Sequence, residues 1–296
     1  MAPREIRDLV RAERRGRVAL LTLDHPPVNV LSRGVLETLG RRLTEAEHDP
    51  EVRVVILASA AEKAFGAGAD VREMRELTPE AAREHAGRGQ ALTRTIERLP
   101  LPVIAAIHGV CFGGGLEVAL ACDFLLASED AQLGQPEINL GVMPGWGGTR
   151  RLPRRVGATR ARRWILTGRT VNAREAEAAG LVDRVVPRAE LLPAAMELAG
   201  ELAEKPPVAL ATAKYALLKA IDPGIDEGLA YELDLWSRLF GTEGQRGRMA
   251  AFVDKQPPPV LGRGRWSEES VGFPWEGPSP RASEGKRIKS SEPPRR

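Results

Sequence analysis

Two long apolar runs limit what this chain can fold into more than any other feature. The runs are "VRVVILASA" (52–60) and "LPVIAAIHGV" (101–110), and β-branched residues are frequent in both. Neither run alternates polar with apolar residues, which is typical of parallel strands covered on both faces. A helix with Ser32 as its N-cap is expected before the first run, and a charged helical stretch separates the two. Strands that alternate with helices predict an α/β fold with much parallel pairing.

Other segments complete a predicted order of elements. A first strand is expected within "GRVALLTLDHP" (16–26), and a short one within "LVDRVVP" (181–187). Helical patterns otherwise dominate from Thr149 to Phe252. The C-terminal residues are rich in Pro, Gly, Ser and charge, and this composition predicts disorder. The predicted parts are a core (1–199), a C-terminal helical region (200–260) and a disordered basic tail (261–296).

The bulk composition fits a soluble globular protein. The 296 residues are 43% hydrophobic and 28% charged, and the formal net charge of +3 lies in the tail. There is no apolar signal-peptide core and no run long enough to cross a bilayer, so we expect a cytoplasmic protein without a membrane partner. Cys111 and Cys122 lie in apolar surroundings and are expected to be reduced thiols, a disulfide being the alternative. Their spacing does not suit a metal, and no metal is expected.

Three successive glycines open a helical segment in "HGVCFGGGLEVALACD" (108–123). Neither a Walker loop nor a dinucleotide fingerprint fits, because the Lys-Ser/Thr pair and the GxGxxG spacing are both missing. A strand that enters a helix through glycines exposes backbone N–H groups at the positive end of the helix dipole. Such donors can stabilise one developing oxyanion, for example on a thioester carbonyl that becomes an enolate. Tight packing of the helix against the strand is the alternative explanation.

A second loop of small residues, "FGAGAD" (65–70), follows the first long strand. Ala67 or Gly68 could offer another backbone N–H, since small side chains allow a substrate to approach closely. Asp70 is well placed to cap the following helix, which explains it without a functional role. Glu117, in the first turn of an apolar helix, and Glu137, after a proline, are the candidate acids. Two acids that share one water can divide acid and base roles, although the sequence leaves their pairing open.

Six ordered motifs resemble the enoyl-CoA hydratase (crotonase) family over about residues 16–256. They are "DHPPVNVLS", "AFGAGADVREM", "AAIHGVCFGGGLEVALACDF", "QLGQPEINLGVMPGWGGTRRLPRRVG", "TGRTVNAREAEAAGLVDRVVP" and "EGQRGRMAAFVDK". The resemblance implies a crotonase-like spiral of β-β-α repeats. It also implies that the C-terminal helices drive formation of a homotrimer, two of which commonly stack into a hexamer.

The resemblance assigns roles to individual residues. It implies that Ala67 and Gly114 donate backbone N–H groups to the thioester carbonyl. It implies that Glu137 protonates Cα of the substrate and that Glu117 orients and deprotonates the attacking water. It also implies further positions along the substrate path, and these are Val28, Gly68, Ala69, Asp70 and Gly145, the last by positioning the second glutamate. No separate cofactor is implied, since coenzyme A is part of the substrate.

The expected activity is the syn addition of water to trans-2-enoyl-CoA, giving 3-hydroxyacyl-CoA in fatty-acid β-oxidation. Both glutamates are present, which favours a hydratase over a Δ3,Δ2-enoyl-CoA isomerase or another crotonase-type enzyme. An alternative of another class is RNA binding through the arginines of 149–163 and the tail, although the weak overall charge does not favour nucleic acid as a partner. His108 is expected to be structural.

Overall fold

The computed structural model describes residues 8–219 and 225–261. A six-stranded sheet forms its centre, with the order β1-β2-β4-β7-β9-β12. The strand β1 runs antiparallel to β2 and the others pair in parallel. The bounds are Val10–Arg15 (β1), Val18–Leu23 (β2), Val54–Ser59 (β4), Val103–Ile107 (β7), Phe124–Ser128 (β9) and Arg184–Val186 (β12). The strands expected at 52–60 and 101–110 are confirmed as β4 and β7.

Shorter strands form two further sheets. The four-stranded sheet has the order β11-β10-β8-β5 and the two-stranded sheet pairs β3 with β6. The bounds are Val30–Leu31 (β3), Ala64–Gly66 (β5), Gly68–Ala69 (β6), Val110–Phe112 (β8), Gln132–Gly134 (β10) and Thr170–Asn172 (β11). Successive strands along the chain alternate between the large and the small sheet, as β4 and β5, β7 and β8, and β9 and β10 do. A helix follows most of these pairs, so the predicted β-β-α repeats are confirmed.

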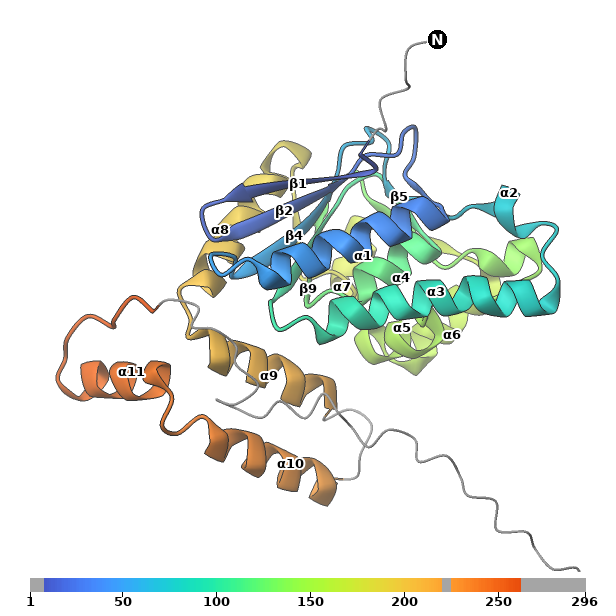
Figure 1. Ribbon diagram of the computed structural model, residues 1–296. Coiled ribbons are helices and arrows are strands. Elements are labelled where there is room, and N and C mark those ends of the chain that lie inside the picture. Colours follow the sequence, from blue (N-terminus) through green and yellow to red (C-terminus); the bar gives the residue numbers. More distant parts are fainter. Residues whose placement is uncertain (1–7, 220–224, 262–296) are drawn as a thin grey trace, which may run out of the picture. The chain divides into compact units, whose positions relative to one another are not determined.

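Helices cover both faces of the large sheet (Figure 1). The side chains of alternate strand residues pack on α8 at one face and on a core with α1 and α3 at the other. The helices are α1 Arg33–His48, α2 Val71–Met74, α3 Pro79–Arg98, α4 Gly114–Leu120, α5 Gly148–Val156, α6 Ala158–Thr167, α7 Ala173–Ala178, α8 Leu191–Ala203, α9 Pro207–Lys219, α10 Ile225–Arg238 and α11 Glu243–Val253. The described residues also contain two 3₁₀ turns, η1 Glu137–Leu140 and η2 Arg188–Glu190.

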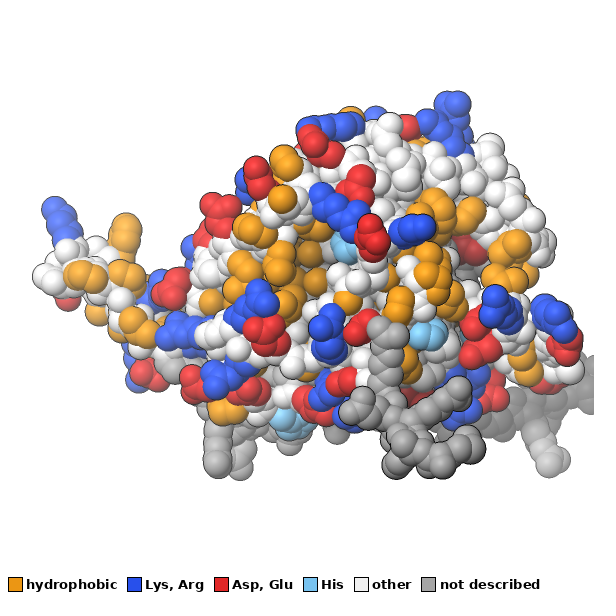
Figure 2. Space-filling view, turned by 90° about the horizontal axis from the view of Figure 1, so that it is seen from above, with side chains coloured by type: hydrophobic (Ala, Val, Ile, Leu, Met, Phe, Trp, Pro, Cys, Tyr) orange, Lys and Arg blue, Asp and Glu red, His pale blue; other side chains and the backbone are white. Residues whose placement is uncertain are grey.

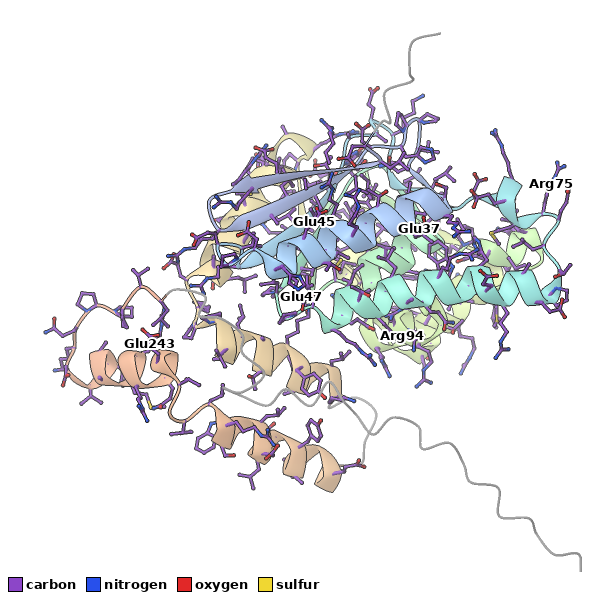
Figure 3. All side chains as sticks on the ribbon, viewed as in Figure 1. Glu37, Glu45, Glu47, Arg75, Arg94 and Glu243 are labelled. Atoms are coloured by element: carbon purple, nitrogen blue, oxygen red, sulfur yellow. The ribbon has the colours of Figure 1, made fainter. Side chains whose placement is uncertain are left out.

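The long helices are amphipathic, as their sequence spacing predicts. In α1 the apolar residues Val35, Leu36, Leu39 and Leu43 are buried. Glu37 and Glu45 on α1 and Arg94 on α3 are exposed side chains (Figure 3). Ser32 stands at the N-cap of α1, but its side chain makes no capping hydrogen bond.

The division into a core (1–199) and a C-terminal helical region (200–260) stays a prediction. The helix α8 crosses the expected boundary at 199/200 and packs on the large sheet as far as Ala203. Residues 262–296 of the expected tail lie outside the described residues. Among the described helices, none combines the length and apolar character that a membrane span requires.

Candidate active site

Glu117 lies in the first turn of α4 and is only 2% exposed. Its Oε1 accepts hydrogen bonds from the backbone N–H groups of Trp146 and Gly148, each at 2.7 Å. Burial raises the pKa of this carboxyl, while the two N–H donors and the charge of Arg151 oppose the rise. The carboxylate is therefore fixed in orientation and has strong donors for its charged form.

Glu137 opens the 3₁₀ turn that follows β10 and Pro136. Both oxygens of its carboxyl are buried and have no hydrogen-bond partner within the described part of the chain. Burial, and to a lesser extent the charge of Glu117, raise the pKa of Glu137 to about 7. The two glutamates thus lie close enough to interact and sit in different environments. An orphaned carboxyl with a raised pKa is the usual signature of a group that handles a proton.

The two small-residue loops meet beside these acids. A methyl group on Gly115 would lie 2.1 Å from the carbonyl oxygen of Gly66, so the backbones touch and only glycine fits. Gly68 has φ +103°, and a methyl group there would lie 3.6 Å from the Gly114 nitrogen. A methyl group on Gly113 would lie 3.3 Å from Glu137 Oε1. The start of α4, the 65–70 loop and Glu137 therefore form one site.

The loop that holds Glu117 is itself anchored on α3. The Trp146 carbonyl accepts hydrogen bonds from Thr93 Oγ1 at 3.1 Å and from Arg151 Nη1 at 2.7 Å. Arg151 also makes two 2.7 Å bonds to the carboxylate of Glu97. The Glu117 carboxylate therefore rests on a support that reaches back to a second helix.

Comparisons with known proteins agree with this geometry. The family model described as enoyl-CoA hydratase/isomerase matches residues 13–263. The chain belongs to the enoyl-CoA hydratase/isomerase family. A short-chain-enoyl-CoA hydratase from Clostridium acetobutylicum is 40% identical over 82% of this chain and 94% of its own. A crotonyl-CoA hydratase from Syntrophomonas wolfei is 38% identical over the same shares of the two chains. A crystal structure of an enoyl-CoA hydratase from Bacillus anthracis gives a TM-score of 0.81 at 38% identity, over 86% of this chain and 99% of that one.

The backbone N–H of Ala67 has a partner in this structure. It donates a 3.0 Å hydrogen bond to the carbonyl oxygen of Val28. The expected role of Ala67 as a donor to the thioester carbonyl stays a prediction. Gly114 occupies the first helical position of α4, where a backbone N–H has no partner within the helix. Val28 thus lies beside the substrate loop through its backbone.

The backbone next to Gly145 holds the first glutamate. The Gly145 carbonyl accepts a 2.9 Å hydrogen bond from Gln90 Nε2, while the N–H groups of Trp146 and Gly148 bind Glu117. The expected role of Gly145 in positioning the second glutamate stays a prediction. Sequence reasoning missed both donors, because a backbone N–H carries no residue-type signal.

The remaining residues of the 65–70 loop have clear structural positions. Ala69 pairs with Leu31 where β6 meets β3. Asp70 accepts a 2.8 Å hydrogen bond from the Arg72 backbone, so its expected capping of α2 is confirmed. The predicted contacts of Gly68, Ala69 and Asp70 with substrate stay predictions.

His108 has a structural position, and the two cysteines are reduced thiols, as expected. His108 Nε2 lies 2.9 Å from the carbonyl oxygen of Ala61, and burial lowers the pKa of this histidine. Cys111 and Cys122 are buried free thiols, and burial raises the pKa of both. The alternative of a disulfide between them is excluded.

Two arginines of the 149–163 segment serve the fold. Arg151 holds the Trp146 loop, and Arg155 donates to the carbonyl oxygens of Cys122 and Asp123 at 3.1 and 3.0 Å. On the face shown in Figure 2, basic, acidic and apolar side chains are interspersed. That face offers no continuous basic surface of the kind that nucleic acid needs.

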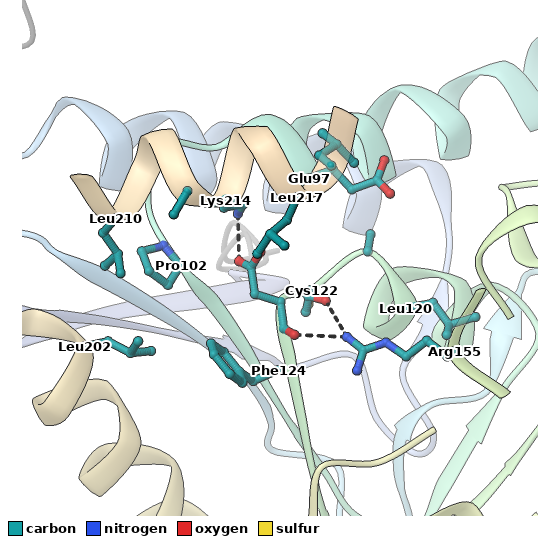
Figure 4. A pocket seen from close by; sticks show the side chains of 14 residues that line it. Glu97, Pro102, Leu120, Cys122, Phe124, Arg155, Leu202, Leu210, Lys214 and Leu217 are labelled. Atoms are coloured by element: carbon teal, nitrogen blue, oxygen red, sulfur yellow. Dashed lines mark hydrogen bonds and ion pairs between the residues drawn. The ribbon is translucent and has the colours of Figure 1, made fainter. Parts of the chain in front are cut away.

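Arg155 also borders a cavity of about 420 Å³ between α9 and the start of β9 (Figure 4). Lys214 on α9 lies 2.7 Å from the Asp123 carboxylate and donates to the carbonyl oxygens of Ile96 and Leu101. The remaining lining is mostly apolar. This ion pair fastens the C-terminal helices to the core.

Proposed function

We propose that this chain adds water to trans-2-enoyl-CoA thioesters and forms 3-hydroxyacyl-CoA. The observation that carries the proposal is the pairing of Glu117 with Glu137 beside the glycine-built start of α4. A hydration requires one base and one acid, and the two carboxyls differ accordingly. The Glu117 carboxylate accepts two backbone hydrogen bonds, whereas the Glu137 carboxyl has no hydrogen-bond partner among the described residues. Two relatives whose names include crotonyl-CoA hydratase and short-chain-enoyl-CoA hydratase support the same reaction.

Glu117 is the base in this proposal. Its anion is favoured by the N–H groups of Trp146 and Gly148, which stay in place throughout the reaction. The carboxylate accepts a hydrogen bond from the substrate water and takes a proton as the water oxygen bonds to C3 of the enoyl group.

Glu137 is the acid. Its raised pKa keeps a large fraction protonated near neutral pH. In this proposal it gives its proton to C2 of the substrate on the same face that receives the water. The proton taken by Glu117 later replaces the one lost by Glu137, so the site returns to its initial state.

The Gly114 N–H supplies electrostatic stabilisation of the transition state. As the C3–O bond forms, negative charge develops on the thioester oxygen, and the donor at the start of α4 stabilises it. One such donor is worth about 3–4 kcal/mol of transition-state energy in other enzymes. Ala67 joins Gly114 only when its N–H leaves the Val28 carbonyl.

The reaction is tested with crotonyl-CoA in ¹⁸O-labelled water. We expect loss of the conjugated-enone absorbance and one ¹⁸O atom in the 3-hydroxyacyl product, a reaction that fits fatty-acid β-oxidation. A 3-enoyl-CoA supplied in parallel separates the isomerase alternative. Rapid conversion of the 3-enoyl substrate without hydration of crotonyl-CoA would contradict the proposal.

We also propose that the chain forms a homotrimer or a hexamer in the cytoplasm. Large apolar side chains are exposed on the C-terminal helices and in the turn after α10, and these are Leu217, Leu229, Leu233, Trp236, Phe240, Met249, Phe252 and Val253. Such a set needs a covering surface in water. Free buried thiols fit a reducing compartment. Light scattering on the purified protein tests the assembly, and a monomer at micromolar concentration would contradict it.

A further inference from the structure

We propose that the indole ring of Trp146 restricts the substrate to short acyl chains of about crotonyl size. This inference rests on the hydratase function proposed above. It adds a specificity-determining role for a side chain whose backbone holds Glu117.

The ring is wedged between two helices at positions where both carry glycine. A methyl group on Gly89 of α3 would lie 2.2 Å from Cδ2 of the ring, and one on Gly114 of α4 would lie 2.5 Å from Cζ3. The residue is 3% exposed. The ring of His85, one helical turn before Gly89, lies 6.0 Å from the indole between ring centres. Tryptophan therefore occupies the volume that two side chains would otherwise fill.

The position of the ring relative to the reacting atoms gives it a function. Gly114 is the proposed donor to the thioester oxygen, and it touches the ring. Trp146 N–H holds the carboxylate that faces C3. The donor to the thioester oxygen and the water-binding carboxylate thus both adjoin this one residue. We therefore place the acyl chain beyond C3 on the side of the ring.

The ring has little freedom to move away from a longer chain. Its ring atoms lie next to Gly89 of α3 and Gly114 of α4, and the Trp146 carbonyl accepts hydrogen bonds from Thr93 and Arg151. Close-packed interiors transmit such a displacement to the neighbouring helices. A short chain ends before the ring, whereas each further carbon requires the ring to be displaced.

The test compares Trp146→Ala with the wild type on trans-2-enoyl-CoA substrates of increasing chain length. The alanine variant keeps the three backbone hydrogen bonds of residue 146. We expect the ratio of kcat/KM for 2-decenoyl-CoA to that for crotonyl-CoA to rise by about tenfold or more. Trp164→Phe, at a buried tryptophan of α6, is the control and should leave the ratio unchanged. If Trp146→Ala does not fold, Trp146→Phe should show a smaller rise in the same direction.

A second measurement tests the close contact between Gly89 and the Trp146 ring. Alanine is a better helix former than glycine, so any loss of Tm in Gly89→Ala must come from contact with the ring. We expect Gly89→Ala to lower Tm in the wild type and to be harmless in the Trp146→Ala background. An unchanged chain-length ratio in a folded, active Trp146→Ala or Trp146→Phe variant would overturn this inference. A wild type that hydrates no enoyl-CoA of any length would overturn the proposed function as well.

Discussion

Oε1 of Glu117 accepts a 2.7 Å hydrogen bond from the backbone N–H of Trp146, which lies 29 residues later in the chain. With the second bond from Gly148, this contact determines the direction of the carboxylate at the start of α4. The base of the proposed reaction is therefore positioned by a loop and not by its own helix.

Removal of the Glu117 carboxylate should lower the free energy of unfolding. Glu117→Ala leaves two buried N–H donors unpaired, whereas Glu117→Gln keeps an acceptor oxygen for them. We expect the alanine variant to be less stable than the glutamine variant by about 2–4 kcal/mol, measured by denaturant unfolding. Equal stability of the two variants would show that the donors find other partners.

Glu137→Gln should increase stability at alkaline pH. The folded pKa of about 7 lies above the ordinary value of 4.5, so the folded state binds more protons between these values. Stability of the wild type therefore falls as pH rises from about 4.5 to 7. After a discount for partial solvent screening, we expect the variant to gain about 1–2 kcal/mol at pH 8 and much less at pH 4.5. A gain that does not depend on pH would contradict the assignment.

Glu137 should also determine how the activity depends on pH. Hydration requires protonated Glu137 in the free enzyme, and the protonated fraction falls above its pKa of about 7. We expect kcat/KM for crotonyl-CoA to decline by about tenfold per pH unit above that value. A profile that stays flat to pH 9 would argue against Glu137 as the acid.

Lys214→Met tests the anchor of the C-terminal helices. The substitution removes the partner of the half-buried Asp123 carboxylate, whose pKa burial already raises. We expect a loss of about 3–5 kcal/mol of unfolding free energy. The matched control is Lys205→Met at an exposed pair with Glu201, where a change of about 0–0.5 kcal/mol is expected. Similar losses in both variants would contradict the anchoring role.

Much of the fold follows from local sequence patterns. The strands β4 and β7 are continuous apolar runs because helices cover both of their faces. The edge strand β1 escaped prediction because only Val10 of its six residues is buried and the rest are exposed, mostly charged. The three-residue strands of the small sheet are too short to give a periodic signal.

Only those residues of the candidate site that residue type marks could be predicted from the sequence. Gly114, Glu117 and Glu137 are marked by residue type, and the structure brings them together. The N–H groups of Trp146 and Gly148, and the bond that occupies the Ala67 N–H, depend on backbone contacts between distant segments. Their geometry is set by tertiary packing, which a local pattern does not encode.

The most direct test of the account is the rate of crotonyl-CoA hydration by the wild type, Glu117→Gln and Glu137→Gln. The wild type should form 3-hydroxybutyryl-CoA. Each variant, while still folded, should lose about 10²–10⁴-fold in kcat. A folded variant of either kind that hydrates crotonyl-CoA at the wild-type rate would contradict the two-carboxyl mechanism.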